Sequence, residues 1–555
     1  MEVTKYLFSF SLLLLLFQKS YSQTEYYFEV SFKDKGNAYS VSNPEVFLSE
    51  SSIKKKTKRN IPVDVLDLPL NPLDIQSMGA YADSVTHQSK WRNSVLIKMT
   101  DTSAVAQIRI LNTVKSVVFL TSKEKKSNKK EQSADKFSAE MNLLSADYGD
   151  GYNQVAMVGG HFMHQRGYKG DSIDIAVFDA GFNPVSVTPY FKMTVADELR
   201  ANGLIKYTWD FLDHDSTVYE KNQHGAMVLS VLANNNNKIK GIAPNANYYL
   251  FITEDDNSET LLEEYNWLMA AERADSIGVD VINSSLGYFT FDDTTTSHTY
   301  KDMDGHTTIV AKAANTAARK GIFVVASAGN EAQTKWHYII SPADGDSVLA
   351  IGAVDGNRKY AAFSSTGPAS DGDIKPNVTA QGYRAVITFD QNRYWASNGT
   401  SFSGPLMAGA VAILWQAFPE LTNLELKKEI EKSASQYTHP DSLLGYGIPD
   451  LMKIFMNGDS SDMYDFNKDV LISMRSNPFT DKIGLEMYSA QKQTINFKLM
   501  DVAGRLMREE NQTIEQNQYM IFGLGDLQNI SSGLYFFIAT DQKGSSQIYK
   551  VVKDQ

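Results

Sequence analysis

The chain of 555 residues contains no cysteine. Disulfide bonds are therefore excluded, as are a thiolate nucleophile and a cysteine-ligated metal centre. A cysteine protease is ruled out.

Positive charge and long apolar runs are also scarce. The formal net charge is −12 at pH 7, and no basic, aromatic-rich motif is present, so we expect no nucleic-acid partner. The apolar run of residues 7–17 is too short to span a bilayer. Because Lys5 precedes this run and Ser20-Tyr21-Ser22 follow it, residues 1–22 are predicted to be a secretory signal peptide, and no transmembrane anchor is expected.

The most informative stretch is residues 398–415, where a short polar turn leads into the apolar run that begins at Pro405. The length and apolarity of residues 405–415 predict a buried helix. Ser401 would then lie at the start of this helix, where free N–H groups and the helix dipole favour developing negative charge on a nucleophile. Taken alone, the stretch favours a simple N-cap at Thr400 or Ser401.

Four further segments precede this stretch. They are Ile173–Gly181, which contains Asp179; Gln223–Val228, which contains His224; Val281–Gly287; and Val324–Glu331, which contains Asn330. With Gly399-Thr400-Ser401-Phe402 and Pro405, these segments resemble the aspartate, histidine, substrate-strand, oxyanion and serine motifs of the subtilisin-like serine proteases (subtilases), in the order typical of that family.

The resemblance implies a secreted serine endopeptidase that forms an acyl-enzyme intermediate. Ser401 would attack the peptide carbonyl, and His224 would take the proton from the hydroxyl and later deliver it to the leaving amine. Asp179 would orient the imidazole and stabilise its charged form. The Asn330 side chain and the Ser401 N–H would form the oxyanion hole.

The substrates implied are proteins or peptides. An extended substrate would pair with the backbone of Ser285, Leu286 and Gly287 as an added strand. Two alternatives stay open. One is a catalytically inactive surface binding protein on the same fold, and the other is an esterase that uses the same triad.

Residues 148–457 alternate strand-like and helix-like patterns. Strands are predicted over 173–178, 248–253, 279–284 and 322–326, and helices over 161–166, 226–232, 261–276 and 309–320. This alternation predicts an α/β fold with a doubly covered parallel sheet. The resemblance implies that this domain is the subtilisin-like peptidase domain.

Residues 23–147 have the pattern of a smaller α/β segment. Strands are predicted over 25–32, 93–98 and 114–120, and a helix over 103–111. In a subtilase this position belongs to a prodomain that acts as an intramolecular inhibitor, and we expect its removal between Lys123 and Asp150. The slight excess of positive charge in this segment complements the acidic remainder of the chain. Lys54–Arg59, in contrast, are interpreted as a solvated charged face.

No cofactor is required by this chemistry, but the resemblance admits calcium. Asp210, Asp213, Asp215 and Glu220 form an acid-rich loop that could bind it. Their spacing does not match an EF-hand, and acid-rich loops are usually only solvated. No metal ligand is therefore assigned.

The end of the chain is predicted to be a separate all-β module. A polar linker at 458–466 precedes residues 467–555, where six strands are predicted over 470–473, 483–487, 493–501, 519–523, 534–539 and 548–552, as in a small sandwich. The motifs around Asn477-Pro478-Phe479 and Ser532-Gly533-Leu534-Tyr535 resemble the C-terminal sorting domain of type IX secretion in Bacteroidetes. That resemblance implies the type IX secretion machinery as a partner, and secretion or surface display via the periplasm. The alternative is a β-sandwich used for binding or stability.

Overall fold

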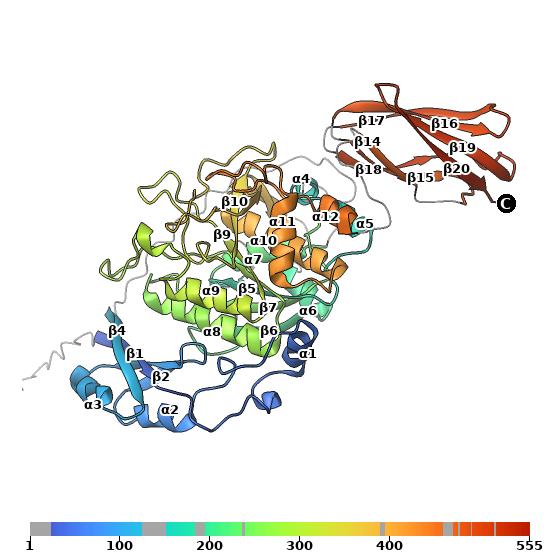
Figure 1. Ribbon diagram of the computed structural model, residues 1–555. Coiled ribbons are helices and arrows are strands. Elements are labelled where there is room, and N and C mark those ends of the chain that lie inside the picture. The colour runs from blue at the N-terminus through green and yellow to red at the C-terminus, as the bar shows by residue number, and fades with distance from the viewer. Residues whose placement is uncertain are drawn as a thin grey trace, which may run out of the picture. The chain divides into compact units, whose positions relative to one another are not determined.

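The computed structural model describes residues 24–124, 151–183, 195–235, 239–388, 394–458, 470–474, 478–489, 491–515 and 518–554. It divides into two compact units, Met1–Asp450 and Leu451–Gln555, and each is described by itself (Figure 1). The expected signal peptide, nearly all of the linker at 458–466 and most of the expected processing region lie outside the described residues. The domain boundaries given above stay predictions.

A seven-stranded sheet forms the centre of the first unit, in the order β11-β10-β9-β8-β5-β7-β6. All of its strand pairs are parallel. The strands are β5 (Asp174–Asp179), β6 (Ile205–Asp210), β7 (Asn247–Ile252), β8 (Val281–Ser284), β9 (Phe323–Ser327), β10 (Leu349–Val354) and β11 (Val378–Gln381). Every residue of β5, β8, β9, β10 and β11 is buried, as expected when helices cover both faces of a parallel sheet.

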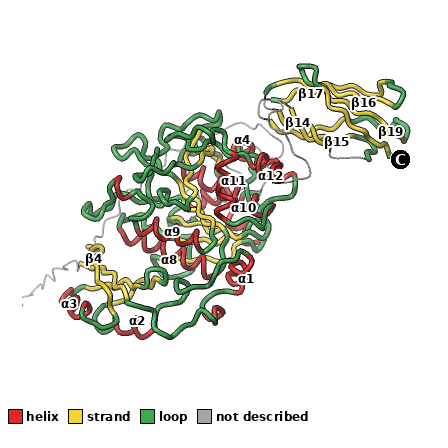
Figure 2. The backbone as a smooth tube through the Cα atoms, in the orientation of Figure 1, coloured by secondary structure: helices red, strands yellow, loops and turns green. Residues whose placement is uncertain are grey.

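The helices that cover the sheet are α7 (His224–Ala233), α8 (Leu261–Ile277), α9 (Ile309–Arg319) and α10 (Thr400–Ala417). Helix α10 packs along β8 to β11 and also against α7, whereas α8 packs against α9 and β5. Figure 2 shows these helices in red around the yellow strands of the sheet. The expected doubly covered parallel sheet is confirmed. Smaller elements complete this part of the unit: α4 (Tyr152–Met157), α5 (Gly160–Gln165), α6 (Val195–Ala201), η3 (Tyr300–Asp302), β12 (Ala385–Thr388), β13 (Tyr394–Ser397) and α11 (Asn423–Ser433).

Residues 24–124, here called the N-terminal module, form a four-stranded antiparallel sheet in the order β2-β3-β1-β4. Its elements are β1 (Thr24–Phe32), η1 (Pro44–Val46), α1 (Glu50–Lys58), α2 (Pro72–Met78), β2 (Ser84–Ser89), β3 (Ser94–Met99), η2 (Thr102–Ala104), α3 (Val105–Arg109) and β4 (Val114–Glu124). One hydrophobic cluster, which includes Phe28, Val30, Met78, Ile97 and Ile108, lies within the module. A second set, Tyr27, Trp91, Leu96 and Leu120, belongs to the same cluster as residues of α8 and α9. The sheet therefore docks onto α8, as the blue strands beside the green helices show in Figure 1.

Ion pairs reinforce this docking, and they correct the interpretation of Lys54–Arg59 as a solvated face. The Lys55 Nζ lies 2.6 Å from carboxylate oxygens of both Asp174 and Asp280. Lys56, whose side chain is 4% exposed, contacts Asp275 at 2.6 Å. Arg59 pairs with Asp280 at 2.6 Å. Only the other two cations of the run, Lys54 and Lys58, are exposed as expected, because they lie on the outer face of α1.

The second unit begins with α12 (Leu451–Gly458) and is otherwise all-β within its described residues. Its two sheets have the orders β14-β15-β18 and β17-β16-β19-β20. The strands are β14 (Val470–Met474), β15 (Ile483–Ser489), β16 (Gln493–Asp501), β17 (Leu506–Ile514), β18 (Gln518–Leu524), β19 (Gly533–Thr540) and β20 (Ser546–Lys553). Residues of both sheets share one apolar cluster, in which Phe497 stacks on Phe522 at a ring separation of 5.1 Å. The expected sandwich is confirmed, although strand β17 was not predicted.

Candidate functional site

The predicted site residues follow strands that are neighbours in the central sheet. In the order β9-β8-β5-β7, strand β9 leads to Asn330, β8 to Ser285, and β5 ends at Asp179 itself. Because parallel strands end at the same edge of a sheet, these residues meet at one carboxyl edge, which is the usual position of sites in open α/β sheets. Helices α7 and α10 begin at this edge with His224 and Thr400.

The structure brings Asp179 and His224 together. Asp179 is fully buried, and its Oδ1 lies 2.8 Å from the His224 Nδ1. The Ala180 N–H also donates to Oδ1 at 2.8 Å. Since a carboxylate accepts hydrogen bonds, the proton of a neutral His224 belongs on Nδ1, which leaves Nε2 as a base. This is the arrangement expected of an imidazole prepared to take a proton.

Gly225 explains how helix α7 comes so close to strand β5. Its N–H donates to the Gly181 carbonyl at 2.9 Å. A Cβ at this position would lie 2.5 Å from that carbonyl oxygen and 2.9 Å from the Asp179 Cβ. Only glycine therefore permits the approach that places His224 on Asp179.

Thr400 links the predicted nucleophile to the predicted oxyanion donor. The Thr400 N–H and hydroxyl both donate to the Asn330 Oδ1, at 2.9 and 3.1 Å. Because a backbone N–H can only donate, this contact identifies Oδ1 as the oxygen and leaves the Nδ2 hydrogens free to point elsewhere. Ser401 is half-buried, and its hydroxyl donates to the Ser285 carbonyl at 3.4 Å.

Hydroxyl groups from neighbouring strands support the start of α10. The Ser327 hydroxyl donates to the Thr400 carbonyl at 2.8 Å, and the Ser285 hydroxyl donates to the Ser401 carbonyl at 3.1 Å. Asn283 in turn donates to the Ser285 hydroxyl at 3.1 Å. These supporting roles were not predicted, and only the position of Ser327 and Asn283 on buried strands could have suggested them.

The predicted substrate-binding segment divides into two parts. Ser285 is committed to contacts with Ser401, as described above. Within the described residues, Leu286 and Gly287 make no backbone hydrogen bond, and pairing resumes at Tyr288, which bridges to Ser341. Leu286 and Gly287 thus present a short unpaired edge, to which an extended chain can add as a strand.

Residues 254–259, which follow β7, form an acidic loop that borders the site. This loop was not predicted. The Asp256 Oδ1 accepts a hydrogen bond from Asn222 at 2.8 Å, and the Asn222 Oδ1 accepts the His224 N–H at 2.7 Å. Burial and the nearby Asp179 charge raise the pKa of Asp256 above its ordinary value. On the other side of the loop, Tyr288 donates to the Glu254 carboxylate.

The loop proposed for calcium contains a built-in cation. The Lys221 Nζ lies 2.6 Å from Asp210 and 2.8 Å from Asp213, so calcium would have to compete with this ammonium. Asp215 instead accepts the Thr217 N–H at 2.7 Å. Elsewhere in the described part of the chain, Glu254, Glu259 and Glu263 gather three carboxylate oxygens within 4.8 Å of one another. Burial and the charge of Glu254 raise the pKa of Glu263 to about 10.

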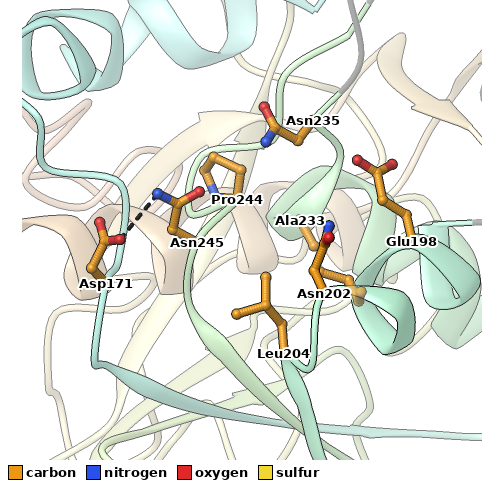
Figure 3. Close-up of a pocket in the computed structure, with 9 residues that line it drawn as sticks. Asp171, Glu198, Asn202, Leu204, Ala233, Asn235, Pro244 and Asn245 are labelled. Atoms are coloured by element: carbon orange, nitrogen blue, oxygen red, sulfur yellow. Dashed lines mark hydrogen bonds between the residues drawn. The ribbon is translucent and has the colours of Figure 1, made fainter.

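A cavity of about 220 Å³ lies at the opposite edge of the sheet. Its lining includes Asp171, Leu204 and Asn245, which precede the amino ends of β5, β6 and β7. Figure 3 shows Asn245 donating to Asp171 across this cavity, at 3.1 Å. Because the predicted site residues lie at the carboxyl edge, the cavity is not part of their site.

Comparison with known proteins agrees with this geometry. The Subtilase family model matches residues 170–447. A Peptidase S8 propeptide domain of Bacteroidota matches residues 27–136, and a Secretion system C-terminal sorting domain matches residues 476–554. The chain belongs to the subtilase family of serine-type endopeptidases, with a propeptide domain before the peptidase domain and a sorting domain after it.

Curated relatives include a thermophilic serine proteinase of Bacillus sp. (strain AK1), 34% identical over 250 residues, which are 44% of this chain and 55% of that protein. Subtilisin DY of Bacillus licheniformis is 30% identical over 275 residues, 49% of this chain and 86% of the relative. Subtilisin E of Bacillus subtilis (strain 168) is 30% identical over 278 residues, 49% of this chain and 63% of the relative. The match thus spans between about half and most of the length of these relatives. Among solved structures, MycP1 from the ESX-1 type VII secretion system matches with a TM-score of 0.46 and 20% identity, over 59% of this chain and 90% of that chain.

The sorting domain implies secretion or export to the cell surface. Among the described helices, none combines the length and the apolarity that crossing a bilayer requires.

Proposed function

We propose that this chain is the precursor of a secreted serine endopeptidase that cleaves protein or peptide substrates through an acyl-enzyme. Asp179, His224 and Ser401 form the triad, and Asn330 donates to the oxyanion. The observation that carries the proposal is the 2.8 Å contact between the Asp179 Oδ1 and the His224 Nδ1, at the sheet edge where Ser401 begins a helix. A buried carboxylate that fixes the tautomer of an imidazole, at the edge where a serine begins a helix, is the arrangement that a proton-transferring triad requires.

In this mechanism His224 Nε2 removes the Ser401 proton as the hydroxyl attacks the scissile carbonyl. The buried Asp179 stabilises the imidazolium that forms, and His224 then protonates the leaving amine. The oxyanion receives hydrogen bonds from the Asn330 Nδ2 and from the Ser401 N–H at the start of α10. The substrate backbone pairs with Leu286 and Gly287, while Ser285 holds the serine turn.

The precursor contains an inhibitory segment and export signals in the same chain. We propose that residues 1–22 direct export, that the N-terminal module inhibits the peptidase domain until the chain is cut between Lys123 and Asp150, and that residues 467–555 engage the type IX secretion machinery. The docking of the module on α8 through apolar and ionic contacts supports the inhibitory role. The mechanism requires no metal, so calcium is compatible with it but not needed.

The test is fluorophosphonate labelling of the purified, matured protein together with digestion of casein. Wild-type protein should be labelled and should cleave casein. Ser401→Ala should lose labelling and lose about 10⁶-fold in turnover, because the nucleophile is gone. Ser216→Ala, which changes an exposed serine of the same domain, is the matched control and should keep both activities.

The outcomes separate the alternatives. Labelling without casein cleavage, but with hydrolysis of ester substrates, would favour an esterase. The absence of labelling after the N-terminal module has been removed would favour an inactive binding protein and would refute the proposal.

A further inference from the structure

The acidic loop, residues 254–259, reads Glu-Asp-Asp-Asn-Ser-Glu and joins two parts of the site. At one end, Asn222 holds both Asp256 and the backbone of His224. At the other end, Glu254 accepts a hydrogen bond from Tyr288, which directly follows the unpaired edge of Leu286 and Gly287. The loop therefore lies between the proposed base and the edge where a substrate would bind.

The N-terminal module places a cation on this loop. Lys123 lies at the end of β4, and its Nζ is 3.5 Å from the Asp255 Oδ2 and 3.1 Å from the Ser258 hydroxyl. Asp255 is held in place by the Asn257 N–H at 3.0 Å and by the Ser258 hydroxyl at 2.8 Å. A lysine side chain of the N-terminal module thus pairs with a carboxylate that is held in place beside the site.

The charges around the loop favour a cation there. Burial, together with repulsion from Glu259 and Asp179, raises the pKa of Glu254 to about 8. The pKa of Asp255 shifts in the opposite direction. Burial alone would raise it, but the hydrogen bonds from Asn257 and Ser258 and the charge of Lys123 lower it below its ordinary value. An ammonium or guanidinium at Asp255 therefore relieves repulsion among neighbouring carboxylates.

We propose that the acidic loop is a specificity subsite that selects a lysine or arginine side chain of the substrate, with Asp255 as its main determinant. Because the module precedes the bond cut in maturation, the side chain that it places on the loop belongs to the N-terminal side of the scissile bond. Lys123 occupies the subsite in the precursor. This inference rests on the proposed function, since it concerns the substrate of the same site.

The experiment uses matured enzyme and internally quenched peptides with one neutral sequence, in which a single lysine or an isosteric glutamine is moved through the positions before the scissile bond. At one position, wild-type enzyme should prefer lysine over glutamine, with a kcat/KM ratio of roughly tenfold, the size of one partly buried charge contact. Asp255→Asn should bring this ratio close to one, and Asp255→Lys should shift the preference towards a glutamate at that position. Ratios within one variant cancel any general loss of activity.

Asp171→Asn is the matched control, because it removes an exposed acid at the opposite edge of the sheet, and it should keep the wild-type ratio. Fluorophosphonate labelling confirms that each variant is folded and active. A wild-type ratio near one at every position would overturn the inference, as would an unchanged ratio in labelled Asp255→Asn. Failure of the proposed function looks different, because neither labelling nor peptide cleavage would then be seen in wild-type protein.

Discussion

The N-terminal module and the all-β part of the second unit, here called the C-terminal module, differ in where their hydrophobic residues lie. The C-terminal module closes its core between its own two sheets, and every member of that cluster comes from residues 479–551. The N-terminal module keeps one cluster to itself but contributes Tyr27, Trp91, Leu96 and Leu120 to the cluster of the peptidase domain. One module completes its own core, and the other shares a core with its neighbour.

This difference matches the two proposed roles. A sorting domain need only remain folded, so its stability can be independent. An inhibitor must stay bound after the chain is cut, and contacts with α8 would provide that binding. The following predictions use the precursor with Ser401→Ala, which lacks the proposed nucleophile. They test whether the N-terminal module is held by the contacts that this comparison names.

The largest effect is expected from Trp91→Ala. Trp91 is 9% exposed and lies in the shared cluster, so its truncation should cost about 3–5 kcal/mol of docking free energy. Hydrogen exchange of the β1 and β3 amides measures the loss. Phe537→Ala, in the C-terminal core, is the control and should leave those amides protected. Equal protection in the two variants would refute the comparison.

The second-largest effect is expected from Asp275→Asn, which should cost about 3 kcal/mol of docking free energy. Asp275 is 2% exposed and pairs with Lys56 at 2.6 Å and with Lys90 at 2.9 Å, so its neutralisation leaves two buried ammonium groups without their main counter-charge. Digestion of the N-terminal module by an added protease should accelerate accordingly, because cleavage follows the open population. An unchanged digestion rate would mean that the apolar contacts alone hold the module.

Acidification should weaken docking through His87. Burial between β2 and α8 lowers the pKa of His87 from its ordinary value to about 4, and its Nε2 lies 2.7 Å from the Asn266 Oδ1. As pH falls below about 6.5, the released module gains a proton that the docked module excludes, so docking loses about 2 kcal/mol between pH 7 and pH 5. Unfolding of the precursor, followed by fluorescence, should show this loss. His87→Gln keeps a donor to Asn266 and should lack that part of the pH dependence; identical pH profiles would contradict the assignment.

The smallest effect is expected from Lys54→Ala. The Lys54 and Glu50 side chains are 72% and 82% exposed, so their ion pair is screened by water and salt. The thermal midpoint of the precursor should not change measurably. A clear decrease would show that the outer face of α1 also takes part in docking.

The meeting of the candidate site residues at one edge could be predicted, because it depends on where strands end. Asp179, Ser285 and Asn330 each follow a short apolar run, and a parallel sheet brings such ends to one edge wherever they stand in the sequence. The support of Ser401 by Ser285 and Ser327 could not be predicted, since it depends on how α10 crosses β8 and β9.

The cations of α1 show a different limit. Lys54 to Arg59 form one basic run in sequence, but the helix turns Lys55, Lys56 and Arg59 towards one face and Lys54 and Lys58 towards another. Helical spacing separates the two faces in advance. What it cannot show is that one face meets Asp174 and Asp280 at the amino ends of β5 and β8, because that contact joins segments more than a hundred residues apart. Strand β17 was missed because most of its residues are polar, and only Ile514 is buried.

The bond between Thr400 and Asn330 has a mechanical consequence. The amide that would stabilise the oxyanion is attached to the residue directly before the nucleophile. Any small displacement of the first turn of α10 therefore carries Ser401 and the Asn330 side chain in the same direction. The hydrogen bonds therefore favour a constant spacing between the proposed nucleophile and the proposed oxyanion donor, so that both groups would reach a bound carbonyl together.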